Sequence, residues 1–108
     1  MSDSISGNLC RARRTVKPRK YNTFLVERPS GEWERFNIPN AWRCWEVAER
    51  FPHSEVYWYL PAGFTLYYSS GPFYGPLWLH VSADSSAEPK PVNLVCIKRG
   101  KGAEYVIN

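Results

Sequence analysis

The chain has 108 residues, of which 44% are hydrophobic and 22% are charged, and its formal net charge is +4. A chain of this length accommodates one modest hydrophobic core. No stretch approaches the roughly twenty apolar residues of a membrane-spanning helix, and the first residues lack the apolar segment of a signal peptide. Cys10, Cys44 and Cys96 are too widely spaced for a Cys-x-x-Cys pair. We therefore expect a cytoplasmic protein with reduced thiols and no membrane association.

The N-terminal part of the chain concentrates the positive charge. Between Cys10 and Tyr21 there is no carboxylate, and six cationic residues are present: Arg11, Arg13, Arg14, Lys17, Arg19 and Lys20. From Tyr21 onward the chain is close to neutral, with eight Lys and Arg and nine Asp and Glu. The basic segment holds too few apolar residues to offset the entropy of ordering it. We therefore expect residues 1–20 to form a flexible basic arm and residues 21–108 to form a single domain.

A cationic arm of this kind is typical of proteins that bind nucleic acid. Lysine and arginine side chains neutralise backbone phosphates and release condensed counterions, which supplies affinity without reading base sequence. The predicted partner is therefore nucleic acid, of unspecified type, or a nucleoprotein assembly. A solvated tail that only increases solubility is the alternative.

The domain begins with a predicted β-hairpin. Residues 21–27 suit a strand, residues 29–31 (Pro-Ser-Gly) have the composition of a turn, and residues 33–38 alternate between apolar and polar as a returning strand does. Apolar residues at helical spacing then predict one helix over residues 41–51. Asn40 is its expected N-cap, and Pro52 is expected to end it.

Five further strands are predicted after the helix, at residues 55–60, 64–69, 77–82, 92–98 and 104–107. Residues 71–76 have the composition of a stiff aromatic loop, and residues 83–91 that of a polar, mobile loop. The order of elements predicts an α+β fold with one helix and a mostly antiparallel sheet of five or six strands. Closure of that sheet into a small barrel is the alternative.

Alternation along these strands separates two faces of the predicted sheet. One face is an ordinary core, with Val56, Trp58, Leu60, Phe64, Leu66, Tyr68, Leu77, Leu79 and Val81. The opposite face collects Tyr57, Tyr59, Tyr67 and Trp78, together with His80. One helix of about twelve residues spans only about 18 Å and cannot cover both faces. We expect the aromatic face to bind a partner, which is a nucleobase, another protein or the folded-back arm.

A second group of cations lies in a glycine-rich hairpin tip and comprises Lys98, Arg99 and Lys101. We include these residues in the predicted nucleic-acid-binding set. The hypothesis is that the tip and the arm line one groove, in which both contact phosphates.

The chain has few residues for catalysis or metal binding. His53 and His80 are its two histidines, and no cluster of Cys, His or carboxylate residues has metal-ligand spacing. A thiol nucleophile at Cys44 with His80 as its base is the one enzymatic alternative. Cys44 belongs to the apolar face of the predicted helix, however, where a buried inert thiol is the usual case. We therefore predict no enzymatic activity, no metal and no cofactor.

These features predict a small non-enzymatic binding module. Its arm positions nucleic acid through phosphate contacts, and its aromatic face makes the more specific contact. The second hypothesis is a small phage or viral accessory protein that binds and inhibits or decorates a protein partner, with the aromatic face as the interface.

Overall fold

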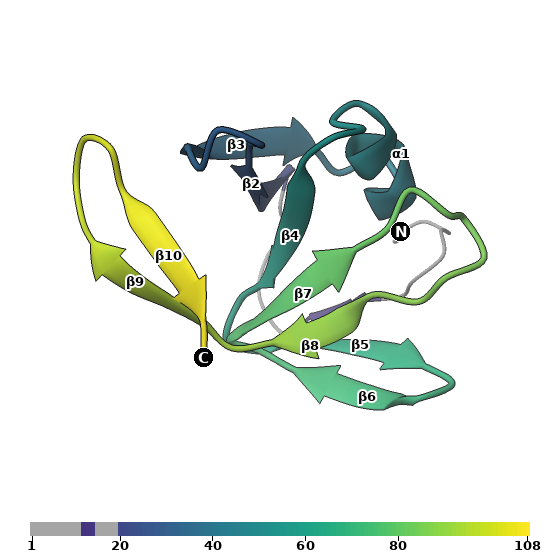
Figure 1. Ribbon diagram of the computed structural model, residues 1–108. Helices are drawn as coiled ribbons and strands as arrows, with labels where there is room; N and C mark the ends of the chain where they lie inside the picture. Colours follow the sequence, from purple (N-terminus) through teal and green to yellow (C-terminus); the bar gives the residue numbers. More distant parts are fainter. Residues whose placement is uncertain (1–11, 15–19) are drawn as a thin grey trace.

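The computed structural model describes the backbone of residues 12–14 and the whole of residues 20–108 (Figure 1). These residues form one short helix and ten strands. In chain order the elements are β1 (Ala12–Arg14), β2 (Tyr21–Glu27), β3 (Trp33–Pro39), α1 (Cys44–Glu49), β4 (Glu55–Leu60), β5 (Phe64–Tyr68), β6 (Gly71–Tyr74), β7 (Leu77–Val81), β8 (Lys90–Val92), β9 (Leu94–Lys98) and β10 (Glu104–Ile107). Among the described residues no helix has the length and apolar character that a membrane span requires.

The strands form three antiparallel sheets. The largest has five strands in the order β3-β2-β4-β7-β8, the second has the order β1-β5-β6, and the third pairs β9 with β10. Each pair of neighbouring strands is antiparallel, so short turns suffice to join most of them. The prediction of a mostly antiparallel sheet with one helix is confirmed for the described residues.

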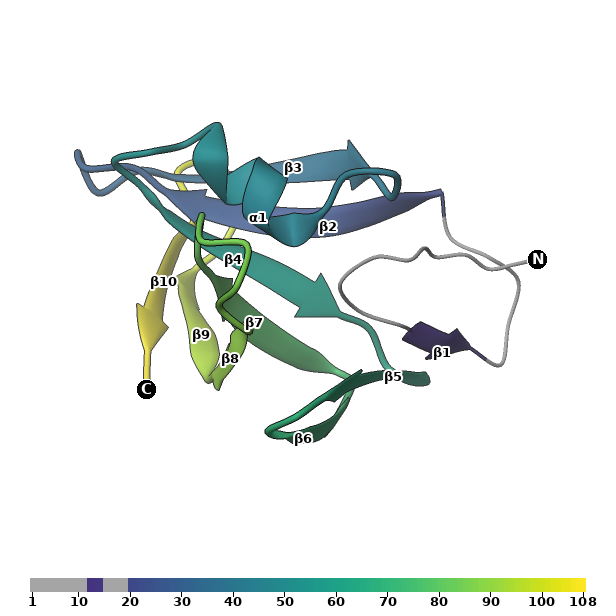
Figure 2. The same ribbon diagram turned by 90° about the vertical axis from the view of Figure 1, so that its right-hand side faces the viewer.

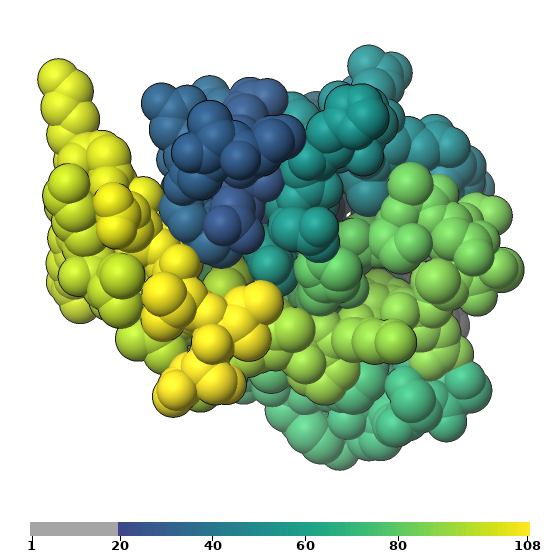
Figure 3. All heavy atoms as spheres, viewed as in Figure 1, coloured from purple at the N-terminus to yellow at the C-terminus, as the bar shows by residue number. Residues whose placement is uncertain are grey.

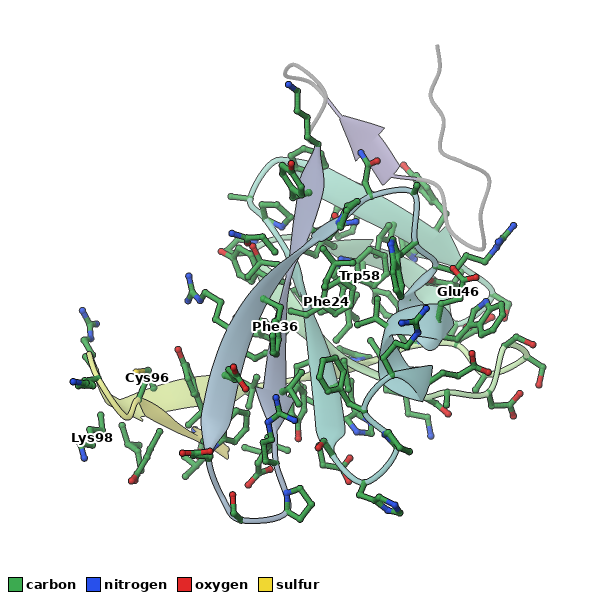
Figure 4. The ribbon with its side chains drawn as sticks, turned by 90° about the horizontal axis from the view of Figure 1, so that it is seen from above. Phe24, Phe36, Glu46, Trp58, Cys96 and Lys98 are labelled. Atoms are coloured by element: carbon green, nitrogen blue, oxygen red, sulfur yellow. The ribbon has the colours of Figure 1, made fainter. Side chains whose placement is uncertain are left out.

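The main hydrophobic core lies between the five-stranded sheet, α1 and β5. At its centre Phe24 and Trp58 are register partners on β2 and β4, and their rings stack with centroids 6.1 Å apart. Figure 4 shows both rings between the strands and α1. The buried members of this core are Phe24, Val26, Cys44, Val47, Ala48, Val56, Trp58, Leu60, Phe64, Leu66, Leu79 and Val81. Alternation along β4, β5 and β7 therefore identified the core side of these strands correctly.

The helix is shorter than the predicted span of residues 41–51. It covers Cys44–Glu49, and its N-cap is Arg43, so the prediction of Asn40 as N-cap is wrong. Arg43 has extended backbone angles, which separate the helix from the turn that follows β3. The Glu46 carboxylate accepts a hydrogen bond from the Arg43 backbone N–H at 2.8 Å. This bond satisfies one donor at the start of the helix and sets its first turn.

Strands lie in both segments where loops were predicted, since β8 begins inside residues 83–91. Residues 71–76 contain β6, which pairs with β5. Phe73 packs against the core, whereas its neighbour Tyr74 is 65% exposed, and this is the two-residue period of a strand. The prediction of a loop gave too much weight to the prolines, which are tolerated in a short strand at a sheet edge.

The predicted strand over residues 92–98 is in fact two strands. The chain leaves the five-stranded sheet at Asn93, so β8 pairs with β7 whereas β9 pairs with β10. The Asn108 backbone N–H donates to the Asn93 carbonyl at 2.8 Å and closes the base of the resulting hairpin. The β9–β10 hairpin and α1 lie on opposite sides of the five-stranded sheet (Figures 1 and 4). The chain's own C-terminal residues thus cover part of the second face.

The polar loop over residues 83–91 is anchored by Glu88. Its carboxylate accepts hydrogen bonds from the Ser69 hydroxyl, from the Ser69 backbone N–H at 3.2 Å and from the Ser70 hydroxyl at 2.9 Å. These bonds favour the charged form, and the Ser69 side chain contributes most, so the pKa of Glu88 lies below its usual range. The loop is therefore tied to the turn between β5 and β6.

Candidate functional site

The candidate site lies on the face of the five-stranded sheet that points away from α1. Strand register places Tyr57 opposite His80 and Tyr59 opposite Trp78 on neighbouring strands β4 and β7. Side chains two residues apart on a strand point to the same side, so all four residues share one face. The β9–β10 hairpin lies over part of this face, and its position decides which of these rings remain accessible.

Tyr57 is only 2% exposed. The Trp33 ring of β3 stacks on it with centroids 5.6 Å apart, and Tyr105 of β10 contacts Trp33 at 5.2 Å. These three rings form a continuous apolar contact between the sheet and the hairpin. We therefore move Tyr57 from the predicted partner-binding set to a second, smaller core, because it has almost no surface left for a partner.

Burial of Tyr57 predicts a distinctive behaviour at alkaline pH. Desolvation, with smaller contributions from Glu27 and Glu55, raises the pKa of Tyr57 to about 12. In the unfolded chain the pKa is about 10, so the stability that this raised pKa contributes is fully present below pH 10. It is lost as the pH rises from about 10 through about 12, and the complete loss is about 2–3 kcal/mol.

The measurement is a comparison of the wild type with Tyr57→Phe, in which this ionisation is absent. We expect the free energy of unfolding to fall more steeply with pH in the wild type than in the variant. The phenolate absorbance assigned to Tyr57 by difference is expected to appear near pH 12. A difference spectrum that titrates near pH 10 would show that the hydroxyl is solvated.

An open groove lies beside this covered region, between the sheet and the hairpin. Its volume is about 540 Å³. We call it the aromatic groove; it is lined by Thr23, Arg35, Tyr59, Trp78, Leu94, Cys96, Arg99, Gly100, Ala103 and Tyr105. In Figure 3 an indentation separates the upper end of the yellow hairpin from the blue strands β2 and β3. Figure 4 shows two labelled residues of the hairpin, Cys96 and Lys98, on the side of the sheet away from α1.

Two half-buried rings of the sheet line the aromatic groove. Tyr59 and Trp78 are direct cross-strand neighbours, and their ring centroids lie 4.9 Å apart with an angle of 48° between the planes. Neighbouring side chains on a β-sheet restrict each other's rotation, so both rings are held in place before any ligand binds. The pair offers a planar or apolar group a preformed contact surface.

The charge around the groove is separated into two regions. Arg35 of β3 and Arg99 of the hairpin tip are exposed and line the groove, and none of its described lining residues is acidic. Two carboxylates of the same face, Glu27 and Glu55, are register partners at the far end of β2 and β4. There Glu55 pairs with the imidazole of His80 at 2.6 Å. The groove is therefore the cationic end of this face.

Tyr67 is not part of the groove. It lies on β5, in the β1-β5-β6 sheet, and is 51% exposed. The sequence pattern assigned it to the same face as Tyr59 and Trp78 because β5 follows β4 in the chain. Instead β4 pairs with β2 and β7, so β5 belongs to another sheet. Phe64 and Leu66 of β5 pack into the main core.

The predicted cations fall into two groups that the structure keeps apart. Arg13 and Arg14 belong to β1, whose backbone pairs with β5, and Lys20 is exposed directly before β2. Figures 1 and 2 place β1 beside β5 and away from the hairpin tip. Arg11, Lys17 and Arg19 lie outside the described residues.

The hairpin-tip cations Lys98, Arg99 and Lys101 are all exposed, and Arg99 lines the aromatic groove. The tip thus comes close to the aromatic rings of the sheet, not to β1. Among the described residues the tip lines a groove with Tyr59 and Trp78. The hypothesis that the arm also lines a groove with the tip stays a prediction, because most of the arm lies outside these residues.

Seven of the ten lining residues were missed by the sequence analysis, among them Arg35 and Tyr105. Arg35 lies two residues after Trp33 on β3, so the sequence indicates that both side chains share one face of the strand. The sequence does not indicate which face of the sheet this is. Tyr105 lies two residues before Ile107 on β10, and its place in the groove depends on the hairpin folding back over the sheet. Alternation was therefore present for both residues, but the fold was needed to interpret it.

The residues of the enzymatic alternative lie on opposite sides of the sheet. Cys44 is the first residue of α1 and is buried in the core, whereas His80 is on the other face of the sheet and pairs with Glu55. His53 is exposed in the turn after α1. Among the described residues no group of three or more Cys, His, Asp or Glu side chains gathers as metal ligands do.

Comparison of the chain with protein-family models, with curated proteins and with solved structures finds no match. The site is therefore interpreted from its own geometry and chemistry.

Proposed function

We propose that this protein is a non-enzymatic cytoplasmic module that binds nucleic acid, with the basic arm and the aromatic groove as its two contact regions. The observation that carries the proposal is the composition of the groove. Two rings in mutual contact, Tyr59 and Trp78, line the groove together with Arg35 and Arg99, and no described lining residue is acidic. Planar rings near guanidinium groups match a ligand that combines flat bases with anionic phosphates.

The two regions contribute different parts of the binding. Arm cations neutralise phosphates at whatever sequence they meet, and so position the protein on the strand. Rings in the groove stack with bases, a contact worth about 1–3 kcal/mol per base in proteins that bind single strands. β1 and the hairpin tip lie apart, so a bound strand that contacts both has to run across the domain.

The proposal is tested by replacing the two groove arginines together, as Arg35→Gln with Arg99→Gln. Both side chains are exposed, so we expect the fold to be unchanged. If each contacts one phosphate, the slope of log K against log salt becomes shallower by about 1.4–1.8. The measurement is fluorescence anisotropy of labelled RNA, single-stranded DNA and duplex DNA across a salt series.

The matched control is Arg43→Gln with Arg50→Gln, which removes two exposed cations around α1, on the other side of the sheet. We expect this control to keep the wild-type slope. Equal slopes for the wild type, the groove variant and the control would show that the groove arginines do not contact phosphates.

A protein partner is the second candidate, and one observation favours it. Val95, Ile97 and Val106 are exposed on the β9–β10 hairpin, with Val95 and Val106 as register partners. A row of aliphatic side chains on a projecting hairpin is a common protein-binding feature. This row supports the protein-binding part of the second hypothesis, a small accessory protein that binds and inhibits or decorates a protein partner, and that candidate predicts no affinity for nucleic acid.

A further inference from the structure

The aromatic groove is large enough to hold a small organic group. Its volume of about 540 Å³ falls within the range of about 300–1,000 Å³ that is typical of sites for small organic ligands. One side of the groove is the sheet with Tyr59 and Trp78, and the other is the hairpin with Leu94, Tyr105 and the tip. A ligand therefore has to enter between two parts of the protein to reach the rings.

This recessed position determines which form of nucleic acid can use the rings. In a duplex both faces of each base are covered by the bases above and below, so an aromatic side chain has no face to stack on. Extruding a base from a duplex costs a few kcal/mol, whereas an unpaired base is already available. Proteins that bind single strands combine a cationic path for the backbone with aromatic platforms for the bases.

Charge sets the direction in which the phosphates of such a strand leave the groove. Glu55 lies four residues before Tyr59 on β4, a separation of about 13 Å at about 3.3 Å per residue, and it is paired across strands with Glu27. Phosphates are repelled from that end of the face. The backbone of the ligand is expected to pass the end with Arg35 and Arg99, close to Lys98 and Lys101.

From this arrangement we infer that the aromatic groove binds unpaired bases and makes the protein selective for single-stranded over double-stranded nucleic acid. The inference rests on the proposed function and adds the class of ligand. It also assigns the selectivity to the rings of Tyr59 and Trp78, because the basic arm attracts the phosphates of either form.

The experiment compares three labelled probes in anisotropy titrations at one salt concentration. They are a mixed-sequence DNA strand of about twelve nucleotides, the RNA strand of the same sequence and the fully paired DNA duplex. For the wild type we expect at least one of the single strands to bind about tenfold more tightly than the duplex. Tryptophan fluorescence is expected to fall on binding of that strand, since Trp78 stacks with a base.

Variants that lack one aromatic ring test whether Tyr59 and Trp78 are the source of the selectivity for single strands. Tyr59→Leu and Trp78→Leu are each expected to lower affinity for the single strand about tenfold, with duplex affinity and salt slope unchanged. Tyr67→Leu is the matched control, because this tyrosine is 51% exposed on β5 and lies outside the groove. It is expected to leave all affinities unchanged. Thermal unfolding of each variant verifies the fold, and the wild-type comparison stands without any variant.

The outcomes separate the inference from the proposed function. Duplex binding as tight as, or tighter than, that of both single strands would overturn the inference and leave the proposed function in place. A selectivity that Tyr59→Leu and Trp78→Leu both retain would also overturn it, since the rings would not be its source. If no probe binds, the proposed function is wrong, the inference with it, and the protein-partner candidate is favoured.

Discussion

Neutralising the arm is expected to reduce nucleic-acid affinity by about two orders of magnitude at about 0.1 M salt. The change is Arg11→Gln, Lys17→Gln, Arg19→Gln and Lys20→Gln in one variant. Each phosphate contact steepens the dependence of log K on log salt by about 0.7 on single strands, so loss of four contacts flattens the slope by about 3. The measurement is anisotropy of a labelled single strand across a salt series.

This variant leaves the residues of β1 unchanged. Arg13 and Arg14 belong to that strand, whose backbone pairs with β5, so deleting the whole arm would also remove a strand from the β1-β5-β6 sheet. Substitutions outside Ala12–Arg14 keep the strand sequence, and we expect thermal unfolding to match the wild type. Any loss of affinity then reports on charge and not on folding.

The control is a variant that neutralises the three hairpin-tip cations, Lys98, Arg99 and Lys101. It is expected to lose less affinity than the arm variant, with a change of slope in the same direction, because fewer charges are removed. Unaltered affinity and slope in the arm variant would contradict the nucleic-acid hypothesis and favour a protein partner.

The largest expected effect on stability comes from Gly75→Ala. A Cβ atom at this position would overlap the backbone carbonyl of Pro61 and would lie 2.7 Å from the Leu60 carbonyl oxygen. The Gly75 backbone N–H also donates to the Phe64 carbonyl at 3.0 Å, which holds the segment before β7 against the start of β5. Backbone atoms cannot move aside as a flexible side chain does, so the turn between β4 and β5 has to shift.

We expect Gly75→Ala to lower the free energy of unfolding by about 3 kcal/mol, a large part of the roughly 5–15 kcal/mol of a domain. The midpoint of thermal unfolding should fall by more than about 10 °C, measured by circular dichroism and tryptophan fluorescence. Gly100→Ala is the control. Its φ of +84° disfavours alanine by about 1 kcal/mol, but no atom lies within 4 Å of the added Cβ. Equal effects of the two substitutions would show that close packing around Gly75 is not limiting.

The spacing of apolar, polar and turn residues was sufficient to predict much of the secondary structure. The strands Tyr21–Glu27, Glu55–Leu60 and Glu104–Ile107 match their predicted ranges, because alternation, turn residues and β-branched or aromatic side chains all agree there. The helix was predicted too long, since apolar spacing does not distinguish a helix from the turn before it. Residues 92–98 were predicted as one strand, because β-propensity continues where the chain changes partner.

The candidate site was predicted only in part. Alternation placed Tyr59 and Trp78 on the face away from the core, and composition identified the hairpin tip as a second cationic group. Alternation also included Tyr57, which is buried, and Tyr67, which lies in a different sheet. The alternation of apolar and polar residues indicates on which side of a strand each side chain lies. It contains no information on which strands pair or what later covers a face.

What the sequence determined by itself about this protein is therefore local: the strands, the residues on their core side and the concentration of cations near the N-terminus, since each depends on residues close together in the chain. Only the tertiary structure decided that β9 and β10 fold back over the sheet after Asn93 and bring Arg99 to the same groove as Arg35 and Tyr59. The physical reason is that the Trp33 ring contacts both Tyr57 of β4 and Tyr105 of β10, which joins segments far apart in sequence.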